Sequence, residues 1–493
     1  MIAYRYLRLC FEGIIIIMEE TIKKSFMIEG EINGNGTDTF QNRYVAWIHL
    51  EQAAKICIAC SCNSNLGAAI QCSDIAIVGN FSSGDKTVAV AAVGANSSII
   101  GLILNLFIGI ALGANVVIAN AIGRKDSETV QKAVHTAIVM ALLGGIAVAI
   151  LGECIAKQVM ELLNVPDEVF PEALLYLRIY LLGMPVIFLY NFEAAIFRSI
   201  GDTKVPLQAL LISGVLNVIM NLFFVIVLHM TVNGVAIATV LSNVVSSLIL
   251  LQKLMKTETC VHVNWNQLKI DRTVFIRMIQ IGLPAGIQGA VFAAANIVIQ
   301  SAINSLGTIV IAASSAAFNI EIIAYYVLNS FSQACTTFVG QNYGAGNMKR
   351  CKRTLLLCLI EDAIASAIAI GLILLTGKYL LAIFNHNPEV IQIGYTRLVI
   401  IFSAYTFSML YEVLSGYLRG FGISLVPAIL TTIGVCGTRI AWIYTVFQNS
   451  RTFATIMFVY PVSLAITAVL IGVATLCYRP SYRKKNCKNK MYD

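Results

Sequence analysis

Uninterrupted apolar stretches of about 20 residues or more recur along this chain and limit what it can fold into. Apolar side chains make up 58% of the sequence and charged ones only 12%, with a mean hydropathy of +0.79. A soluble domain carries about 25% charged residues, so this chain has too few to cover a water-facing surface. In a bilayer every backbone polar group must be bonded internally, and runs of this length favour helices. The sequence therefore predicts an all-α membrane protein.

Twelve transmembrane helices are predicted. The first is the weakest, because it contains Lys55 and a Cys/Ser/Asn cluster at 60–65. The second is longer than a bilayer requires, so we expect it to tilt, bend or protrude. The predicted spans are residues 53–78, 88–120, 133–153, 172–197, 206–229, 234–252, 278–303, 309–338, 354–375, 392–418, 425–448 and 453–477.

Basic residues gather in alternate loops, the pattern that places such loops in the cytoplasm. Both ends of the chain are then cytoplasmic, which agrees with an even number of spans in a multi-pass protein of the cell membrane. The net charge of +8 reflects these loops and the basic tail rather than nucleic-acid binding. The loops hold Arg124, Lys125 and Lys132; Arg198 and Lys204; Lys253, Lys256, Lys269, Arg272 and Arg277; and Lys349, Arg350, Lys352 and Arg353.

The two halves of the sequence repeat each other. Phe197–Pro206 aligns with Leu418–Pro427, and the Arg, Gly and Pro positions coincide at an offset of 221 residues. Ala119–Gly123 falls on Gly340–Gly344 at the same offset. These matches predict two pseudo-symmetric lobes of six helices that enter the membrane from the same side, which is a parallel internal repeat.

The repeat also predicts how the chain is divided and where it binds its substrate. A site between two lobes that rock against each other is the basis of alternating access. Asp74 of the first lobe falls opposite Asn296 of the second when one residue is allowed for a longer loop. The predicted divisions are a poorly specified cytoplasmic extension at 1–52 without a convincing signal peptide, the first lobe at 53–252, a cytoplasmic linker at 253–277, the second lobe at 278–477 and a basic cytoplasmic tail at 478–493.

Signatures of enzymes and of cofactor sites are absent from the sequence. It contains no Walker A, HExxH or GxSxG pattern, its 5 histidines are scattered, and its 13 cysteines lack zinc-site spacing. We therefore expect no catalytic residue, no cofactor and no metal beyond a coupling sodium ion. Without an ATP-binding domain, transport has to draw its energy from an ion gradient.

Carboxylates inside the predicted spans are the strongest functional candidates, because an ionisable group in hydrocarbon costs at least about 2.5–3.5 kcal/mol. Asp74 is the leading candidate for binding a proton or a sodium ion, and a structural hydrogen bond is the alternative. Glu321 and Glu412 are candidates for coupling or for substrate contact.

Two other acidic positions are expected to be structural. Glu193 lies near Arg198 at a helix end, which predicts an interfacial salt bridge. The adjacent Glu361 and Asp362 lie within two turns of Arg353, and we expect them to pair with it or to extend toward the membrane surface.

Amide side chains are also frequent in the predicted spans. Asn217 and Asn221 share one helix face, which predicts hydrogen bonding between helices, with the lining of a polar cavity as the alternative. Gly109 and Gly113 have the spacing that permits close helix approach, although the signal is weak. The amides that we expect to contribute to coupling or substrate contact are Asn191, Asn217, Asn296 and Gln300, and further intramembrane amides are Gln288 and Gln333.

Five motifs spread over both halves point to one family: Ser73–Phe81, Leu106–Ile118, Tyr190–Pro206, Thr337–Gly346 and Glu412–Gly422. Together they resemble the multidrug and toxic compound extrusion (MATE) transporters, over roughly residues 70–477. The resemblance implies a twelve-helix, two-lobed exporter that exchanges sodium ions or protons for drug-like compounds, often cationic or aromatic.

The resemblance also carries over site residues. The family's first-helix carboxylate corresponds to Asp74. The tenth-helix acid of some branches would fall near Ser408, so this chain either uses Glu412, one turn later, or lacks that site. Two features depart from the family pattern: Glu193 stands where relatives have a small residue, and the first helix lacks its usual proline.

The sequence thus predicts a monomeric secondary antiporter whose partners are small organic substrates and the lipid bilayer, and it does not choose between sodium ions and protons. A lipid-linked sugar flippase of the same superfamily is an alternative. Such proteins usually carry more basic residues in the central cavity, and here only Arg439 is clearly inside a predicted span. A non-transporting membrane scaffold or sensor and an intramembrane enzyme are further alternatives.

Overall fold

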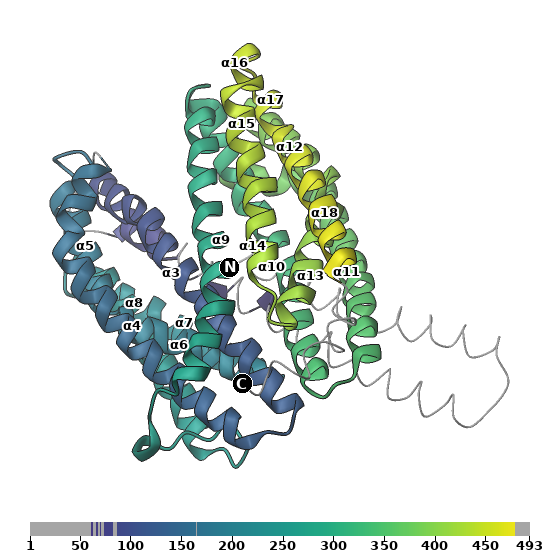
Figure 1. Cartoon of the computed structure of the whole chain (residues 1–493). Helices are drawn as coiled ribbons and strands as arrows, with labels where there is room; N and C mark the ends of the chain where they lie inside the picture. Colours follow the sequence, from purple (N-terminus) through teal and green to yellow (C-terminus); the bar gives the residue numbers. More distant parts are fainter. Residues whose placement is uncertain are drawn as a thin grey trace.

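The computed structural model describes residues 61–62, 66–67, 70, 73–81, 86–163 and 165–478, most of which are helical. The helices form two groups, α3–α8 and α9–α18, which converge at one end and splay apart at the other (Figure 1). The predicted extension at 1–52 and nearly all of the predicted tail lie outside the described residues.

The first group follows a short helical segment at residues 73–81. Its helices are α3 (Lys86–Gly123), α4 (Ser127–Leu162), α5 (Phe170–Leu182), α6 (Met184–Ser199), α7 (Lys204–Leu222), which continues into a π-helical turn η1 (Phe223–Val227), and α8 (Val232–Lys256).

A connection that contains the 3-10 turn η2 (Trp265–Gln267) leads to the second group. Its elements are α9 (Arg272–Asn304), α10 (Thr308–Gly344), α11 (Met348–Phe384), α12 (Pro388–Ser403), α13 (Tyr405–Gly420), α14 (Leu425–Thr431), the π-helical η3 (Thr432–Gly437), α15 (Thr438–Tyr444), α16 (Val446–Asn449), α17 (Phe453–Met457) and α18 (Val459–Tyr478).

The described residues contain nine helices long and apolar enough to cross a membrane, or eleven when each of two bent pairs counts as one span. The helical segment at 73–81 falls at the end of the predicted first span, the rest of which lies largely outside the described residues. The bends were not predicted: α5 meets α6 at 50°, and α12 meets α13 at 49°. Apolar content locates a span, but it does not report a break within one.

The internal repeat is visible in the element boundaries, which recur 221 residues apart. Helices α4 and α11 begin at Ser127 and Met348, and α8 and α17 begin at Val232 and Phe453. The two bends also match, because Gly183 and Ala404 are separated by the same offset. Two sequence halves with the same breaks therefore fold as two versions of one unit.

The backbone of the turns repeats as well. Gly201 and Gly422 have φ values of 84° and 80°, and Lys125 and Gly346 have values of 58° and 74°. Glycine adopts this left-handed region without steric cost, which explains why glycine was one of the repeated residues in the motif.

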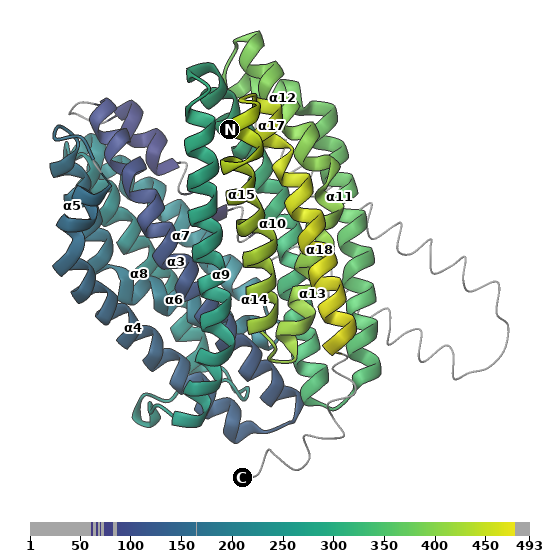
Figure 2. The same ribbon diagram turned by 45° about the horizontal axis from the view of Figure 1, so that its top comes forward.

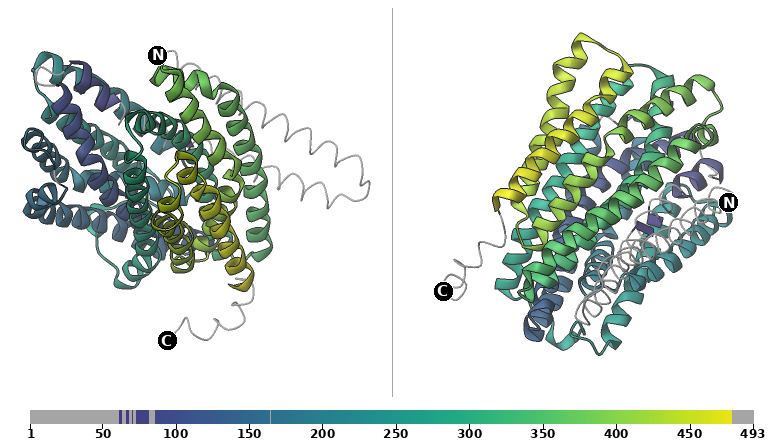
Figure 3. Two further views of the ribbon diagram at one scale, coloured as in Figure 1. Left: turned by 90° about the horizontal axis from the view of Figure 1, so that it is seen from above. Right: turned by 90° about the vertical axis from the view of Figure 1, so that its right-hand side faces the viewer.

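The two halves touch most closely along α3 and α9, which lie beside each other at the junction (Figures 2 and 3). A Cβ atom on Gly109 would strike the backbone of Gly286, and one on Gly113 would strike Met278 and Gly282. The predicted close approach through Gly109 and Gly113 is confirmed, because these positions leave no room for a side chain.

The basic loops gather at the end where the halves converge. The Gln341 Nε2 atom donates to the Ser199 carbonyl at 2.7 Å, so the ends of α10 and α6 meet there. The Asn264 amide of the inter-half connection donates to His135 Nε2 of α4 at 3.2 Å. The basic loops are thus on one side of the molecule, as the charge pattern predicted, and the assignment of that side to the cytoplasm stays a prediction.

Candidate functional site

A cavity of about 530 Å³ lies between the two halves and is lined by both. Helices α3 and α6 contribute the first-half wall, and α9, α10, α12, α13, α14, α15 and α18 contribute the second. At the converging end Asn115 Nδ2 donates to Thr337 Oγ1 at 3.1 Å across the junction. The halves therefore meet at one end of the cavity, where hydrogen bonds join them.

Asp74 lies outside the lining of this cavity, in a separate polar cluster within the first half. Its carboxylate is buried, with 4% of the residue exposed. The Oδ1 atom accepts from Asn221 Nδ2 at 2.6 Å, and Oδ2 accepts from Thr239 Oγ1 at 3.0 Å. Asn217 completes the cluster, because its Oδ1 accepts from Asn221 at 3.0 Å. The helix of Asp74 is thus connected to α7 and α8 by hydrogen bonds through a single carboxylate.

The donor atoms of this cluster fit a small cation. Asn221 Oδ1 is buried and has no hydrogen-bond partner among the described residues. Together with the Asp74 carboxylate and the Thr239 hydroxyl it offers oxygen atoms, which are the ligands that hard cations prefer. No group of three or more His, Cys, Asp or Glu side chains suited to a metal ion occurs in the described part of the chain.

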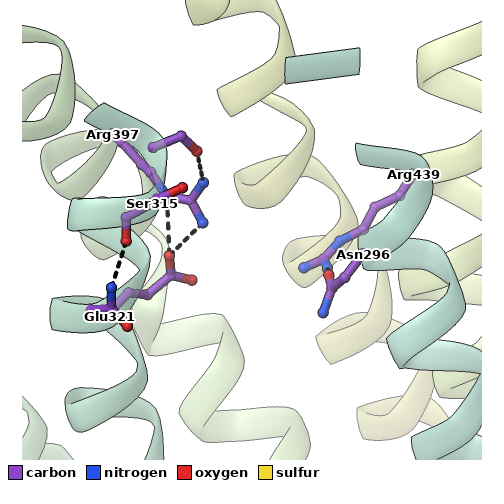
Figure 4. Close-up of polar contacts among 7 residues, drawn as sticks. Asn296, Ser315, Glu321, Arg397 and Arg439 are labelled. Atoms are coloured by element: carbon purple, nitrogen blue, oxygen red, sulfur yellow. Dashed lines mark hydrogen bonds and ion pairs between the residues drawn. The ribbon is translucent and has the colours of Figure 1, made fainter. Parts of the chain in front are cut away.

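The second half carries an arginine at the equivalent place. Tyr460 and Ser463 correspond to Thr239 and Ser242 at the offset of 221. Asn296, the counterpart of Asp74, accepts from Arg439 Nη1 through its Oδ1 at 3.0 Å (Figure 4). The guanidinium carbon of Arg439 lies 4.4 Å from the centre of the Tyr460 ring. The second half thus holds an arginine beside Asn296, where the first half holds the carboxylate of Asp74.

Glu321 lines the cavity and is ion-paired. Arg397 Nη2 donates to its Oε2 at 2.9 Å, and Arg397 Nη1 donates to Ser314 Oγ at 2.5 Å. Figure 4 shows Glu321 with Arg397 on one side and Arg439 with Asn296 on the other. This pairing makes Glu321 part of a neutral unit, whereas the sequence had suggested it as a candidate cation or substrate site.

Glu412 lines the cavity on α13 and is buried. The Tyr325 hydroxyl donates to its Oε1 at the long distance of 3.5 Å. Ser408, one turn earlier, lines the same wall. Glu412 is therefore placed to contact a substrate, and its role in transport stays a prediction.

Of the candidate amides, Asn191 lines the cavity on α6 and Asn217 lies in the Asp74 cluster. Gln300 belongs neither to the cavity lining nor to the Asp74 cluster. It is exposed and donates to Asn304 Oδ1 at 2.8 Å. The expectation that Gln300 contributes to a site was wrong, because it is not among the residues that line the cavity and its side chain bonds Asn304 instead.

The predicted pairing of Glu193 with Arg198 was also wrong. Glu193 is fully buried and accepts from Ser247 Oγ at 2.9 Å, while Arg198 donates to Gln333 Oε1 at 2.8 Å. Residues five apart on a helix point in different directions, so nearness in sequence did not make them partners.

Glu361 and Asp362 do not pair with Arg353 or reach the membrane surface. Both are buried on α11, where Asp362 accepts from Ser366 Oγ at 2.9 Å. Both carboxylate oxygens of Glu361 lack a hydrogen-bond partner among the described residues.

Sequence reasoning missed two arginines of the cavity. The sequence placed Arg198 in a basic loop and gave Arg419 no functional role, yet both line the cavity between the halves, together with Arg439. Basic residues near the ends of the predicted spans thus reach the cavity as well. The signal was present, because Arg198 and Arg419 are the repeated arginines of the 221-residue offset.

Two repeated helical units around a shared cavity, with a buried carboxylate in one of them, are the architecture of a multi-pass membrane transporter. Within that class the chain belongs to the MatE family, the multidrug and toxic compound extrusion transporters. The family model matches residues 63–223 and residues 284–445, which confirms the resemblance seen in the motifs.

Two similar proteins are named as probable multidrug resistance proteins. The chain is 25% identical over 393 residues to the probable multidrug resistance protein YoeA of Bacillus subtilis strain 168, covering 78% of this chain and 84% of that protein. It is 27% identical over 372 residues to the probable multidrug resistance protein YpnP of the same organism, covering 75% of this chain and 82% of that protein.

A solved structure shows the same fold. It is described as the outward-facing conformation of a multidrug resistance MATE family transporter of the MOP superfamily, and it matches with a TM-score of 0.81 at 20% identity. The match covers 88% of this chain and 97% of that one. This likeness and the element order support the two-lobed, twelve-helix architecture.

Proposed function

We propose that this protein is an exporter that moves small organic molecules through the cavity between its halves in exchange for a cation bound at Asp74. The carrying observation is the polar cluster around Asp74, with a buried carboxylate and an unpartnered amide oxygen on Asn221. A buried charge of this kind is costly unless it is neutralised, and a sodium ion or a proton would do so.

Coupling in this proposal arises from what occupancy does to the first half. Asp74, Asn221 and Thr239 belong to three different helices, so a cation among them would change how these helices pack. A ligand shifts a two-state equilibrium by the difference in its affinity for the two states. One charge moved through 100 mV supplies about 2.3 kcal/mol, which is enough to bias such an equilibrium.

The side to which the cavity opens follows from the orientation. The halves converge at the end with the basic loops and splay apart at the other end (Figure 1). If the basic end faces the cytoplasm, the cavity opens away from it. The similar solved transporter is likewise described as outward-facing.

A lipid-linked sugar flippase is a second candidate function, and one observation favours it. Three arginines line the cavity, namely Arg198, Arg419 and Arg439, whereas only Arg439 is clearly inside a predicted span. Basic side chains of this kind suit a phosphate-bearing substrate.

Efflux from proteoliposomes tests the proposal. Sodium and pH gradients are imposed separately on vesicles that contain the parent protein or Asp74→Asn, and release of a fluorescent dye is followed. We expect the parent to respond to one of the two gradients and Asp74→Asn to lose that response, because an amide cannot carry the charge that binds the cation.

Asp167→Asn is the matched control, since Asp167 is an exposed aspartate of the same half. It should export like the parent. Equal, gradient-dependent efflux by the parent and by Asp74→Asn would contradict the assignment of Asp74.

A further inference from the structure

The cavity wall contains more positive than negative charge once internal pairs are considered. Arg198, Arg419 and Arg439 line it, together with Glu321 and Glu412. Within the described part of the chain, Glu321 is the one lining carboxylate that forms an ion pair, and Arg397 neutralises it. Three guanidinium groups then face one remaining carboxylate.

Each of the three guanidinium groups is held by an uncharged partner. Side-chain amide oxygens accept from all of them: Gln333 Oε1 from Arg198 at 2.8 Å, Gln288 Oε1 from Arg419 at 3.0 Å, and Asn296 Oδ1 from Arg439 at 3.0 Å. An amide fixes the direction of a guanidinium without neutralising its charge. The Glu412 carboxylate acts on Arg419, and the charges of Arg198 and Arg439 stay available to a ligand.

One donor in this set has no partner. The Nε atom of Arg419 is buried without a hydrogen bond among the described residues, and 9% of the residue is exposed. A buried donor of a cation is costly to leave unsatisfied, and an acceptor on a ligand would satisfy it. Because Arg198 and Arg419 are repeat equivalents, the two halves present this group from both sides of the junction.

Aromatic rings line the same cavity beside the arginines. Phe292 and Tyr460 flank Arg439, with ring centres 5.1 Å and 4.4 Å from its guanidinium carbon. Tyr325 and Tyr405 line the second-half wall as well. Such a wall offers stacking surface to a planar ligand next to a positive charge.

We infer that the substrates of this cavity are planar organic anions, with a carboxylate, sulfonate or phosphate group bound by Arg439 and Arg419 and a ring system stacked on the aromatic wall. The inference rests on the proposed function and narrows its substrate class. It differs from the cationic compounds that the family resemblance implied.

Two dyes with the same ring system and opposite charge provide the test. Fluorescein is an anion and rhodamine 123 is a cation, and both are built on a xanthene core. Binding of each to the purified full chain in neutral detergent is measured by fluorescence anisotropy. We expect fluorescein to bind about tenfold more tightly than rhodamine 123, or better, because one charged hydrogen bond accounts for at least that factor.

Variants of the cavity arginines test whether these residues cause the preference for fluorescein over rhodamine 123. Arg439→Gln and, separately, Arg419→Gln should each weaken fluorescein binding about tenfold or more and leave rhodamine 123 unaffected or bound more tightly. Arg439→Lys should retain part of the affinity. Arg451→Gln is the matched control, because Arg451 is exposed at the end of the same half and, among the residues that the structure describes, bonds Gln448 alone. Tighter binding of rhodamine 123 by the parent, or unchanged fluorescein binding in both cavity variants, would overturn the inference.

Nanodiscs of phosphatidylcholine, with or without phosphatidylglycerol, distinguish a soluble anion from a lipid headgroup. If a lipid phosphate competes for the arginines, phosphatidylglycerol should weaken fluorescein binding to the parent more than it does in Arg439→Gln. If binding is the same in both lipids, the anion comes from solution. Either result supports anion recognition.

These binding assays need no ion gradient, so the inference and the proposed function can fail separately. Fluorescein binding without gradient-driven efflux would reject only the antiport. Efflux with a preference for rhodamine 123 would reject only the anionic substrate class.

Discussion

Charged side chains inside the two halves are held in three different ways. Asp74 accepts from amide and hydroxyl groups, Glu321 is ion-paired with Arg397, and Arg439 is held by an amide and two aromatic rings. The carboxylates could be predicted from the sequence, because a charge in an apolar run is conspicuous. Their partners could not, since Arg397 comes 76 residues after Glu321 and no local spacing reports the contact.

Removal of one member of the Glu321–Arg397 pair is expected to be destabilising. Glu321→Gln leaves the almost fully buried Arg397 without its counter-ion, which costs about 3 kcal/mol. The thermal unfolding midpoint in detergent should fall clearly. Glu153→Gln is the control, because its pair with Arg178 at 3.4 Å is partly exposed and contributes less than about 1 kcal/mol. A shift no larger than that of the control would contradict the structural role of the buried pair.

At the scale of elements, helix existence was more predictable than helix shape. Spans followed from apolar runs, whereas the bends at Gly183 and Ala404 and the π-helical turns η1 and η3 depend on tertiary packing. The repeat predicts local features that the sequence of a single helix does not, because a feature seen in one half is expected 221 residues away in the other. The N-terminal caps of α4 and α11 are an example of features that recur at this offset.

Asp126 and Asn347 are repeat-equivalent caps of α4 and α11, and they differ in charge. Asp126 accepts from the Thr129 amide at 3.0 Å, and Asn347 accepts from the Arg350 amide at 3.1 Å. Replacement of either by alanine should lower the stability by about 1 kcal/mol at pH 7. The Tm of each variant in detergent measures this loss.

The stability contributions of the two caps should depend differently on pH. Hydrogen bonds from Thr129 hold the pKa of Asp126 below its usual value. The carboxylate therefore stabilises the fold above the ordinary aspartate pKa of about 3.9, and this contribution is lost as the pH falls through the lower pKa of the folded state. The effect of Asp126→Ala should shrink toward pH 3 and that of Asn347→Ala should not. Parallel pH profiles would contradict this account of the cap.

Substitution of two glycines, one on α9 and one on α3, by alanine is expected to change the stability in opposite directions. A Cβ on Gly286 would strike the Leu106 carbonyl, so Gly286→Ala should destabilise by about 1–3 kcal/mol and weaken efflux. A Cβ on Gly101 of α3 would meet no described atom within 4 Å, so Gly101→Ala should raise the stability by up to about 1 kcal/mol. Tm values in detergent check both. A higher Tm for Gly286→Ala would show that the helices can separate without cost.

For the whole molecule, the sequence predicted two lobes and a cavity between them. The structure adds that the two lobes carry different charged groups. The first half holds the carboxylate cluster of Asp74, and the second holds Arg439 at the equivalent place. The asymmetry was not apparent from the alignment of Asp74 with Asn296 alone, because it needs the side chain of Arg439 from another helix. We expect that cation coupling belongs to the first half only.

Distance measurements between the halves test most directly whether Asp74 controls their movement. Spin labels are introduced as non-natural amino acids, because the chain has 13 cysteines. The labelled positions are Glu168, in the connection before α5, and Ser450, in the connection between α16 and α17. Helices α16 and α17 and the α4–α5 connection lie at the splayed end (Figure 1). The distance distribution is recorded with and without the cation that drives efflux. The parent should shift its distribution when the cation is added, and Asp74→Asn should not. The same shift in both proteins, or none in the parent, would contradict coupling through Asp74.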